Sequence, residues 1–232
     1  MHGPIVKQIL RLELLVVLVA ALVASACGNG GEEQQQAETR TLPEEEQALL
    51  PGEYRSEVFE PSLSFRVGEG WSNVPPEVYD TLLLTRGHDV GGLGFANLQG
   101  ATFYGATRTG MPRPQDVPED VVAWFRRHPY VRTSEPEPTT VGGVKGVRID
   151  VVVEGLPDDH NGMCGTNCVD VCRVSSGGPP IALVEGHKGR MIILEDVRGE
   201  TVLTGFFSPA GEFDEHAVEA QRVIDTVQWG SS

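Results

Sequence analysis

Positive charge is scarce in this chain. Its 232 residues include 18 Lys and Arg against 33 Asp and Glu, which gives a formal net charge of −15 at pH 7. Nucleic acids and anionic lipid surfaces attract proteins largely through clustered cations. The composition therefore argues against nucleic-acid binding and against a charge-driven membrane contact.

Hydrophobic runs long enough to span a bilayer are missing too. The apolar run Leu14 to Ala24 has eleven residues, whereas a membrane-spanning helix needs about 20. Lys7 and Arg11 precede the run, and small residues follow it as far as Ala26. This order is typical of a secretory signal peptide, predicted over residues 1–26.

The end of that segment resembles the lipobox of bacterial lipoproteins. The residues concerned are Leu22-Val23-Ala24-Ser25-Ala26-Cys27. The resemblance implies that diacylglycerol is attached to the Cys27 sulfur and that palmitate-type chains hold the protein on the extracytoplasmic face of the cell membrane. An ordinary cleaved signal with an incidental cysteine, or an uncleaved anchor, remains open. Two or more acyl chains anchor a protein stably, whereas one does not.

Residues 27–52 lack a hydrophobic period. They combine early glycines with Gln34-Gln35-Gln36 and Glu44-Glu45-Glu46, a composition that stays solvated and extended. We expect an acidic flexible tether here, followed by one globular domain over residues 53–230.

The domain alternates hairpin-like strands with two helices. Leu63, Phe65 and Val67 have the period of a half-buried strand, as do Val147 to Val153. Helices are expected from Asp116, an N-cap candidate, to His128, and from Glu212 to Val227. Further strands are expected over 54–59, 82–84, 93–98, 101–107, 181–185, 190–197 and 200–207, with Arg198-Gly199 as a tight turn. The order predicts an α+β fold, an antiparallel sheet flanked by helices.

Two segments carry a family resemblance. Ser64-Phe65-Arg66-Val67-Gly68-Glu69-Gly70-Trp71, and the last hairpin with its helix ending at Asp225-Thr226-Val227, are similar to the Mog1/PsbP-like fold. Bacterial lipoproteins of the LpqN type share the lipobox, tether and single domain. The resemblance implies an α/β/α sandwich with a binding or assembly role, and it carries over no catalytic residue.

Cysteine is rare, and three of the four cysteines fall in one segment. With Cys27 lipidated, Cys164, Cys168 and Cys172 remain, an odd number in an exported chain. We predict a structural Cys164–Cys168 disulfide that leaves Cys172 reduced, with Cys168–Cys172 as the competing pair.

The same segment offers an alternative chemistry. His160 with Cys164, Cys168 and Cys172 could bind zinc, or the thiols could form a redox site over 158–172. The C-x₃-C-x₃-C spacing matches neither a zinc ribbon nor the C-x₂-C redox motif, so we expect neither a metal nor another cofactor.

Catalytic motifs are also missing from the sequence. It contains no G-x-S-x-G serine elbow, and Ser175-Ser176-Gly177-Gly178 is typical of a turn. Gly91-Gly92-Leu93-Gly94 lacks the lysine of a phosphate loop and is expected to be a loop between strands. His88, His128, His187 and His216 are scattered, and Trp71, Trp124 and Trp229 are expected in the core.

These observations favour a lipid-anchored binding or envelope-assembly domain over an enzyme. The expected partners are the membrane, through the lipid, and an envelope protein or small ligand of unknown identity. An extracytoplasmic hydrolase, or the metal or redox loop at 158–172, is the alternative.

Overall fold

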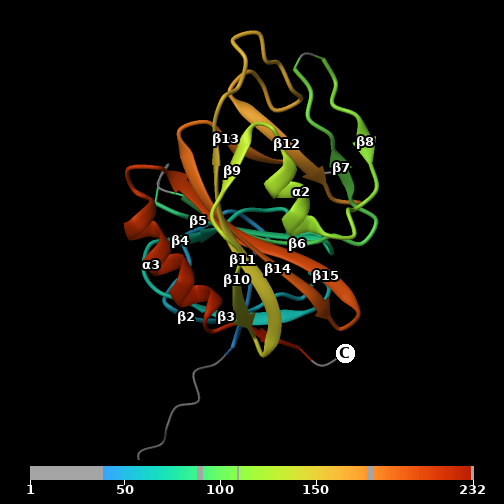
Figure 1. The fold of residues 1–232 in the computed structure, drawn as a ribbon. Helices are drawn as coiled ribbons and strands as arrows, with labels where there is room; N and C mark the ends of the chain where they lie inside the picture. The colour runs from blue at the N-terminus through green and yellow to red at the C-terminus, as the bar shows by residue number, and fades with distance from the viewer. Residues whose placement is uncertain (1–38, 88–90, 109, 177–179, 231–232) are drawn as a thin grey trace, which may run out of the picture. The chain divides into compact units, whose positions relative to one another are not determined.

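The computed structural model describes residues 39–87, 91–108, 110–176 and 180–230. The chain divides into two units, Met1–Gln36 and Ala37–Ser232, and every described residue belongs to the second. The described residues form three sheets and two helices (Figure 1). The expectation of a sheet-rich fold with two helices is therefore confirmed.

The central sheet has eight strands. Seven follow the order β10-β11-β14-β15-β6-β5-β4, and β9 pairs beside β11. Their bounds are β4 Trp71–Asn73, β5 Thr81–Arg86, β6 Gly91–Asn97, β9 Val131–Thr133, β10 Glu137–Val141, β11 Val144–Val153, β14 His187–Val197 and β15 Glu200–Pro209. All of these pairings are antiparallel. Arg198 and Gly199 form the predicted turn between β14 and β15, with φ of 60° and 88°.

Two smaller sheets and two helices complete the fold. One sheet has the order β1-β2-β3-β16 and the other β13-β12-β7-β8. Their bounds are β1 Arg40–Thr41, β2 Gly52–Arg55, β3 Leu63–Val67, β16 Gln228–Trp229, β7 Thr102–Tyr104, β8 Pro114–Gln115, β12 Cys168–Arg173 and β13 Ile181–Val184. The helices are α2 Val121–Arg127 and α3 Phe213–Ile224.

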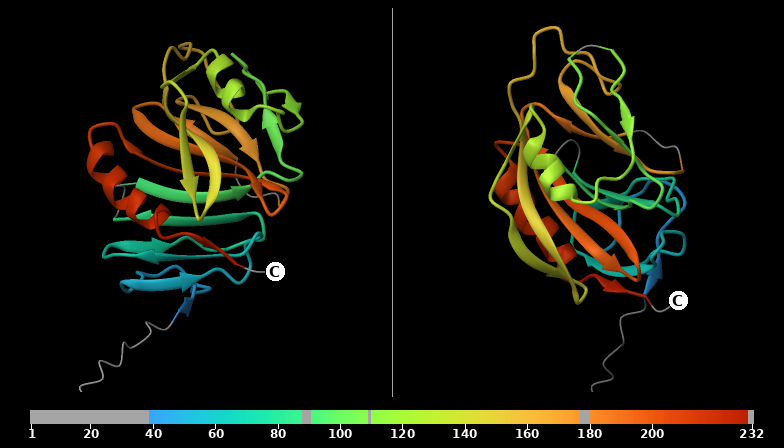
Figure 2. Two further views of the ribbon diagram at one scale, coloured as in Figure 1. Left: turned by 60° about the horizontal axis from the view of Figure 1, so that its bottom comes forward. Right: turned by 45° about the vertical axis from the view of Figure 1, so that its right-hand side comes forward.

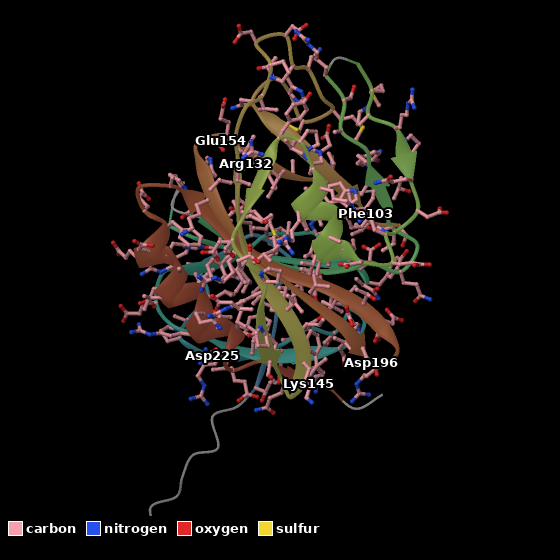
Figure 3. All side chains as sticks on the ribbon, in the orientation of Figure 1. Phe103, Arg132, Lys145, Glu154, Asp196 and Asp225 are labelled. Carbon is pink, nitrogen blue, oxygen red and sulfur yellow. A yellow bond between two sulfur atoms is a disulfide. The ribbon has the colours of Figure 1, made fainter. Side chains whose placement is uncertain are left out.

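The central sheet separates two hydrophobic cores. Successive side chains on a strand point to opposite faces. On β14, Ile192 and Leu194 therefore join the core that contains α3 and β3, whereas Met191 and Ile193 join the core that contains α2 and β12. In the second core, Phe103 of β7 packs edge-on against Trp124 of α2, with ring centroids 5.2 Å apart. Figure 2 shows the covering elements from two further sides, and Figure 3 labels Phe103.

Helix α2 begins later than the sequence predicts. The Asp120 carboxylate accepts a hydrogen bond of 2.7 Å from the Ala123 N–H and so caps the helix at Val121. Asp116 does not act as the cap, because the residues just before it, Pro114–Gln115, are held extended as β8 against β7. Pairing with a distant strand has overridden the local capping signal.

Helix α3 follows its predicted apolar stripe closely. It spans Phe213–Ile224 inside the expected range 212–227, and Phe213, Ala220 and Ile224 are buried in the first core. Val218 lies on the opposite side and is 52% exposed. Among the described residues, neither helix is long and apolar enough to cross a membrane.

The prediction of a tether up to residue 52 is wrong for its described part. Residues 40–41 pair in parallel with 54–55 in β2, and Leu42 and Leu49 are buried in the first core. The Asn73 amide donates to the carbonyls of Pro43 and Glu45 at 2.8 and 2.9 Å. This stretch was mistaken for a tether because its two core leucines are isolated among acidic residues.

We predict that this N-terminal stretch contributes to stability through Leu49. Replacing the buried Leu49 by Ala should lower the free energy of unfolding by about 2–4 kcal/mol. The matched control is Leu50→Ala, since Leu50 is 67% exposed and its loss should change stability by at most about 0.5 kcal/mol. Urea unfolding of both variants measures the difference, and equal midpoints would contradict the packing of this segment.

Candidate functional site

The cysteine segment contains the predicted disulfide. Cys164 and Cys168 are bonded, with Cα atoms 6.0 Å apart, and Cys172 is free and buried in β12. Burial raises the pKa of the Cys172 thiol to about 12, so the thiol stays protonated at neutral pH. A protonated, inaccessible thiol is neither a nucleophile nor a metal ligand.

Side-chain hydrogen bonds fix the same segment independently of the sulfurs. Both carboxylate oxygens of Asp170 accept backbone N–H groups, from Met163 at 2.7 Å and from Cys164 at 3.1 Å. The His160 ring donates from Nε2 to the Cys168 carbonyl at 2.8 Å. A side chain at Gly162 would not fit, because its Cβ would lie 2.6 Å from an Asp170 oxygen.

The structure does not assemble the alternative metal site. In the part of the chain that the structure describes, no three His, Cys, Asp or Glu side chains are grouped so that they could hold a metal ion. His160 uses one ring nitrogen for the Cys168 carbonyl, and two of the three candidate sulfurs are bonded to each other. The geometry supports a structural segment over 158–172.

A row of rings connects this segment to α2. The centroid of the His128 ring lies 5.3 Å from that of Trp124 and 5.8 Å from that of Tyr130, and the Tyr130 ring lies 5.9 Å from His160. Burial, and to a lesser extent the nearby charge of His160, lowers the pKa of His128 to about 4. Consistently, His128 Nδ1 accepts a hydrogen bond from the Tyr130 N–H at 3.3 Å.

Gly91-Gly92-Leu93-Gly94 is a strand rather than the expected loop. These residues begin β6, with Leu93 buried in the first core and Gly92 and Gly94 on the opposite face. In β15, next to β6, Gly205 pairs with Gly94 in the same row. Three glycines therefore leave a stretch of the second face of the central sheet without side chains, which we call the glycine floor (Gly92, Gly94 and Gly205).

A hollow lies over the glycine floor. The hollow has a volume of about 60 Å³. Its walls include Leu83, Met191 and Leu203, together with Ile181 of β13. Phe207 lines this hollow and also a wider one of about 490 Å³, which extends to Thr85, His187 and Pro209. Drug-sized ligands occupy pockets of roughly 300–1,000 Å³. We call the two hollows together the glycine cleft.

The glycine cleft is bordered by unusually exposed apolar side chains. Leu83 is 39% exposed and Phe207 is 42% exposed. A methyl of Leu83 lies 2.7 Å from the position that a Cβ on Gly94 would take, and the edge of the Phe207 ring lies 3.1 Å from the corresponding position on Gly92. The glycines thus allow these two side chains to lie flat on the sheet.

A hydrogen-bonded clasp joins the residues just before β5 to the segment after β12. The buried Asp80 carboxylate accepts from the Ser175 hydroxyl at 3.0 Å and from the Ser176 N–H at 2.7 Å. Tyr79 adds a bond of 2.6 Å to the Ser175 hydroxyl. Among the described residues, no histidine hydrogen-bonds to Ser175.

The remaining predicted residues do not converge on one place. Trp71 and Trp124 are buried in different cores, and His216 is buried between Trp71 and Phe206. Trp229 is partly buried and donates to the Val141 carbonyl at 3.0 Å. Cys27 and His88 lie outside the described residues. The sequence signal that could have located the cleft is the alternation of Gly92 and Gly94 with Leu93 and Phe95.

Comparison with protein-family models and with curated proteins found no match for this chain.

We predict that His128 makes the protein less stable in acid. Its ordinary pKa is about 6.5 but its folded pKa is about 4, so only the unfolded chain binds the proton between these values. The free energy of unfolding should therefore fall as the pH drops from about 6.5 to about 4, by up to about 3 kcal/mol from this group. In His128→Asn, which keeps an acceptor for Tyr130 but does not titrate, the fall should be smaller.

Urea unfolding of both proteins at pH 7 and at pH 4.5 measures this contribution. Parallel losses of stability in the two proteins would show that His128 does not titrate differently in the folded and unfolded chains.

Proposed function

We propose that this protein is a lipid-anchored, extracytoplasmic binding protein that takes an apolar ligand into the glycine cleft. The single observation that carries the proposal is the glycine floor beneath the exposed Leu83 and Phe207. Exposed apolar clusters on a monomer often mark a functional surface. A floor of three glycines on strands that are otherwise rich in large apolar residues allows these side chains to lie against the sheet beside the hollows.

The anchor part of the proposal rests on the sequence. The charged start, the eleven-residue apolar run and the small residues before Cys27 occur in the order that a lipoprotein signal requires. The disulfide between Cys164 and Cys168 supports an oxidising compartment, because disulfides persist in exported proteins. The proposal thus places the domain outside the cytoplasm, held at the membrane through Cys27.

The Mog1/PsbP-like resemblance belongs to the same proposal. Supporting it are the early strand β3, the turn before Trp71, and the closing hairpin β14–β15 followed by α3. The two helices belong to the cores on opposite faces of the central sheet. Small sheets share the covering of both faces with the helices, which is an elaboration of a simple α/β/α sandwich.

We predict that Cys27 is the acylated first residue of the processed protein. Replacing Cys27 by Ser should release the protein into the medium or leave an unprocessed precursor, because the thioether-linked lipid can no longer form. Fractionation of cells expressing either chain, with mass spectrometry of the native N-terminal peptide, measures this. An unmodified Cys27 in the native protein would overturn the anchor.

We predict that Gly94→Val removes ligand binding by filling the cleft. The new side chain would take the space of a Leu83 methyl and push Leu83 into the hollow, so affinity for a neutral apolar probe such as Nile red should fall about ten-fold or more. Gly68→Val is the matched control, since a Cβ there meets no atom within 4 Å. Fluorescence titration compares the three proteins.

The expected result is that the control binds the probe as the unchanged protein does. Equal binding by Gly94→Val and the control, or no binding of Nile red by the unchanged protein, would rule out the glycine cleft as an apolar ligand site.

A further inference from the structure

Two buried histidines meet where the residues after β7 lie against the cysteine segment. His128 and His160 are 7% and 4% exposed, and both line a hollow of about 10 Å³ that also touches Pro112, Tyr130 and Asp170. A hollow of this volume holds about one water molecule. The two imidazoles are therefore almost without hydration in the folded protein. We call this place the histidine junction.

The histidine junction separates two loops at the same end of the described domain (Figure 1). Residues 105–107 and Pro112, between β7 and β8, lie on one side of the hollow, and the cysteine segment lies on the other. An exposed ion pair, Arg108 with Asp159 at 2.9 Å, joins the loops at the surface. Exposed ion pairs add little stability. The buried side of the junction therefore decides whether the loops stay together.

Hydrogen bonds fix both imidazoles in their neutral forms. The His128 Nδ1 atom accepts from the Tyr130 N–H at 3.3 Å and so carries no proton. The His160 ring donates from Nε2 to the Cys168 carbonyl at 2.8 Å, and its Nδ1 atom is buried without a hydrogen-bond partner among the described residues. An imidazolium ion carries an N–H at both ring nitrogens. A new proton on His128 would face the Tyr130 donor, and a new proton on His160 would have no acceptor.

The acids near the junction are already engaged. Asp170 is the one acid among the described residues that line the hollow, and both of its carboxylate oxygens accept backbone N–H groups. Asp159, next to His160 in the chain, is paired with Arg108 at the surface. Neither carboxylate is hydrogen-bonded to an imidazole in the closed form, so a positive charge on either ring would lack a partner.

The remaining ionisable groups oppose a positive charge or do not affect it. Arg126 and Arg127 form the last turn of α2, just before His128. Tyr130 is an uncharged phenol at neutral and acid pH. Burial, and then the charge of His160, lowers the pKa of His128 to about 4. The junction is therefore stable only while both histidines are neutral.

We propose that the histidine junction is a pH-sensitive switch that opens in acid. In the closed form His128 and His160 are neutral and shielded from water. A proton binds to either ring only after the cysteine segment has moved away from residues 105–107 and water has entered. Acid therefore favours the open form, while the central sheet stays folded.

The switch is separate from the proposed ligand site. The junction shares no lining residue with the glycine cleft. A domain on the extracytoplasmic face, as proposed above, meets the ambient pH directly, and histidine is the side chain suited to respond to it. Opening in acid would change the surface that the two loops present to a partner.

Hydrogen exchange of single amides, followed by NMR, tests the switch in the full chain carrying Cys27→Ser. The reporters are the N–H groups of Tyr130, Met163 and Cys164, which donate to side chains at the junction. The pKa of His128 is about 4 in the closed form and should be about 6.5 in the open form. The protection factors of the reporters should therefore fall about fifty-fold between pH 7 and pH 4.5. Amides of β14, in the central sheet, should keep theirs.

A double variant removes the titration but keeps the hydrogen bonds. The amides of His128→Asn and His160→Gln take positions near those of Nδ1 and Nε2, respectively, and do not titrate. In this variant the reporters should be about equally protected at both pH values. The matched control is His187→Asn, because His187 does not line the junction. The control should show the same fall in protection as the unchanged protein.

Three results would overturn the switch, and two of them need only the unchanged protein. Equal protection of the reporters at pH 7 and pH 4.5 would show that the junction does not open. An equal loss of protection in β14 would show global unfolding, as charging the buried His216 would produce. A fall in protection that persists in the double variant would show that other groups drive the opening. None of these results bears on Nile red binding, so the switch and the glycine cleft can fail separately.

Discussion

The fold depends on burying both faces of the central sheet. Strand β14 alternates Ile192 and Leu194 with Met191 and Ile193, so its two sets of side chains enter different cores. At about 25 cal/mol per Å² of apolar surface buried, neither set can be left in water without a large loss of stability. The small sheets and the helices are therefore all covers for one two-sided sheet, and their positions follow from where its apolar rows lie.

The glycine cleft lies where this requirement is relaxed. Gly92, Gly94 and Gly205 have no side chains of their own to bury on the second face, so these three positions do not require a cover of their own. Leu83 and Phe207 then lie down across the bare strands and provide most of the local cover. The same glycines allow these side chains to lie flat on the sheet. A binding cleft at this position is thus compatible with a stable core on either side.

The sequence predicted the elements whose signal is local. The apolar stripe of α3 and the alternation in β11 each lie within one segment, and both elements appear where they were expected. The Cys164–Cys168 pair followed from export and from the odd number of thiols, and it is confirmed. These predictions needed no knowledge of what each segment packs against.

What the sequence did not predict depends on partners far along the chain. Leu49 is recognised as a core residue only once Trp71 and Asn73 of β4 lie beside its segment, because Leu49 N donates to the Trp71 carbonyl at 2.7 Å. Asp120 caps α2 instead of Asp116 because β8 pairs with β7. The glycines of β6 were mistaken for a loop because glycine disfavours strands, and their value is visible only beside Gly205.

The cysteine segment, a candidate redox or metal site in the sequence, has a structural arrangement in the fold. In a redox site, the disulfide must be accessible to the thiol that reduces it. Here Cys168 begins β12 and is almost fully buried. Besides the disulfide, hydrogen bonds of Asp170 and His160 hold the segment, and a disulfide that closes so short a loop contributes about 2 kcal/mol at most. The segment is therefore held by several independent interactions, which suits a fixed framework beside α2.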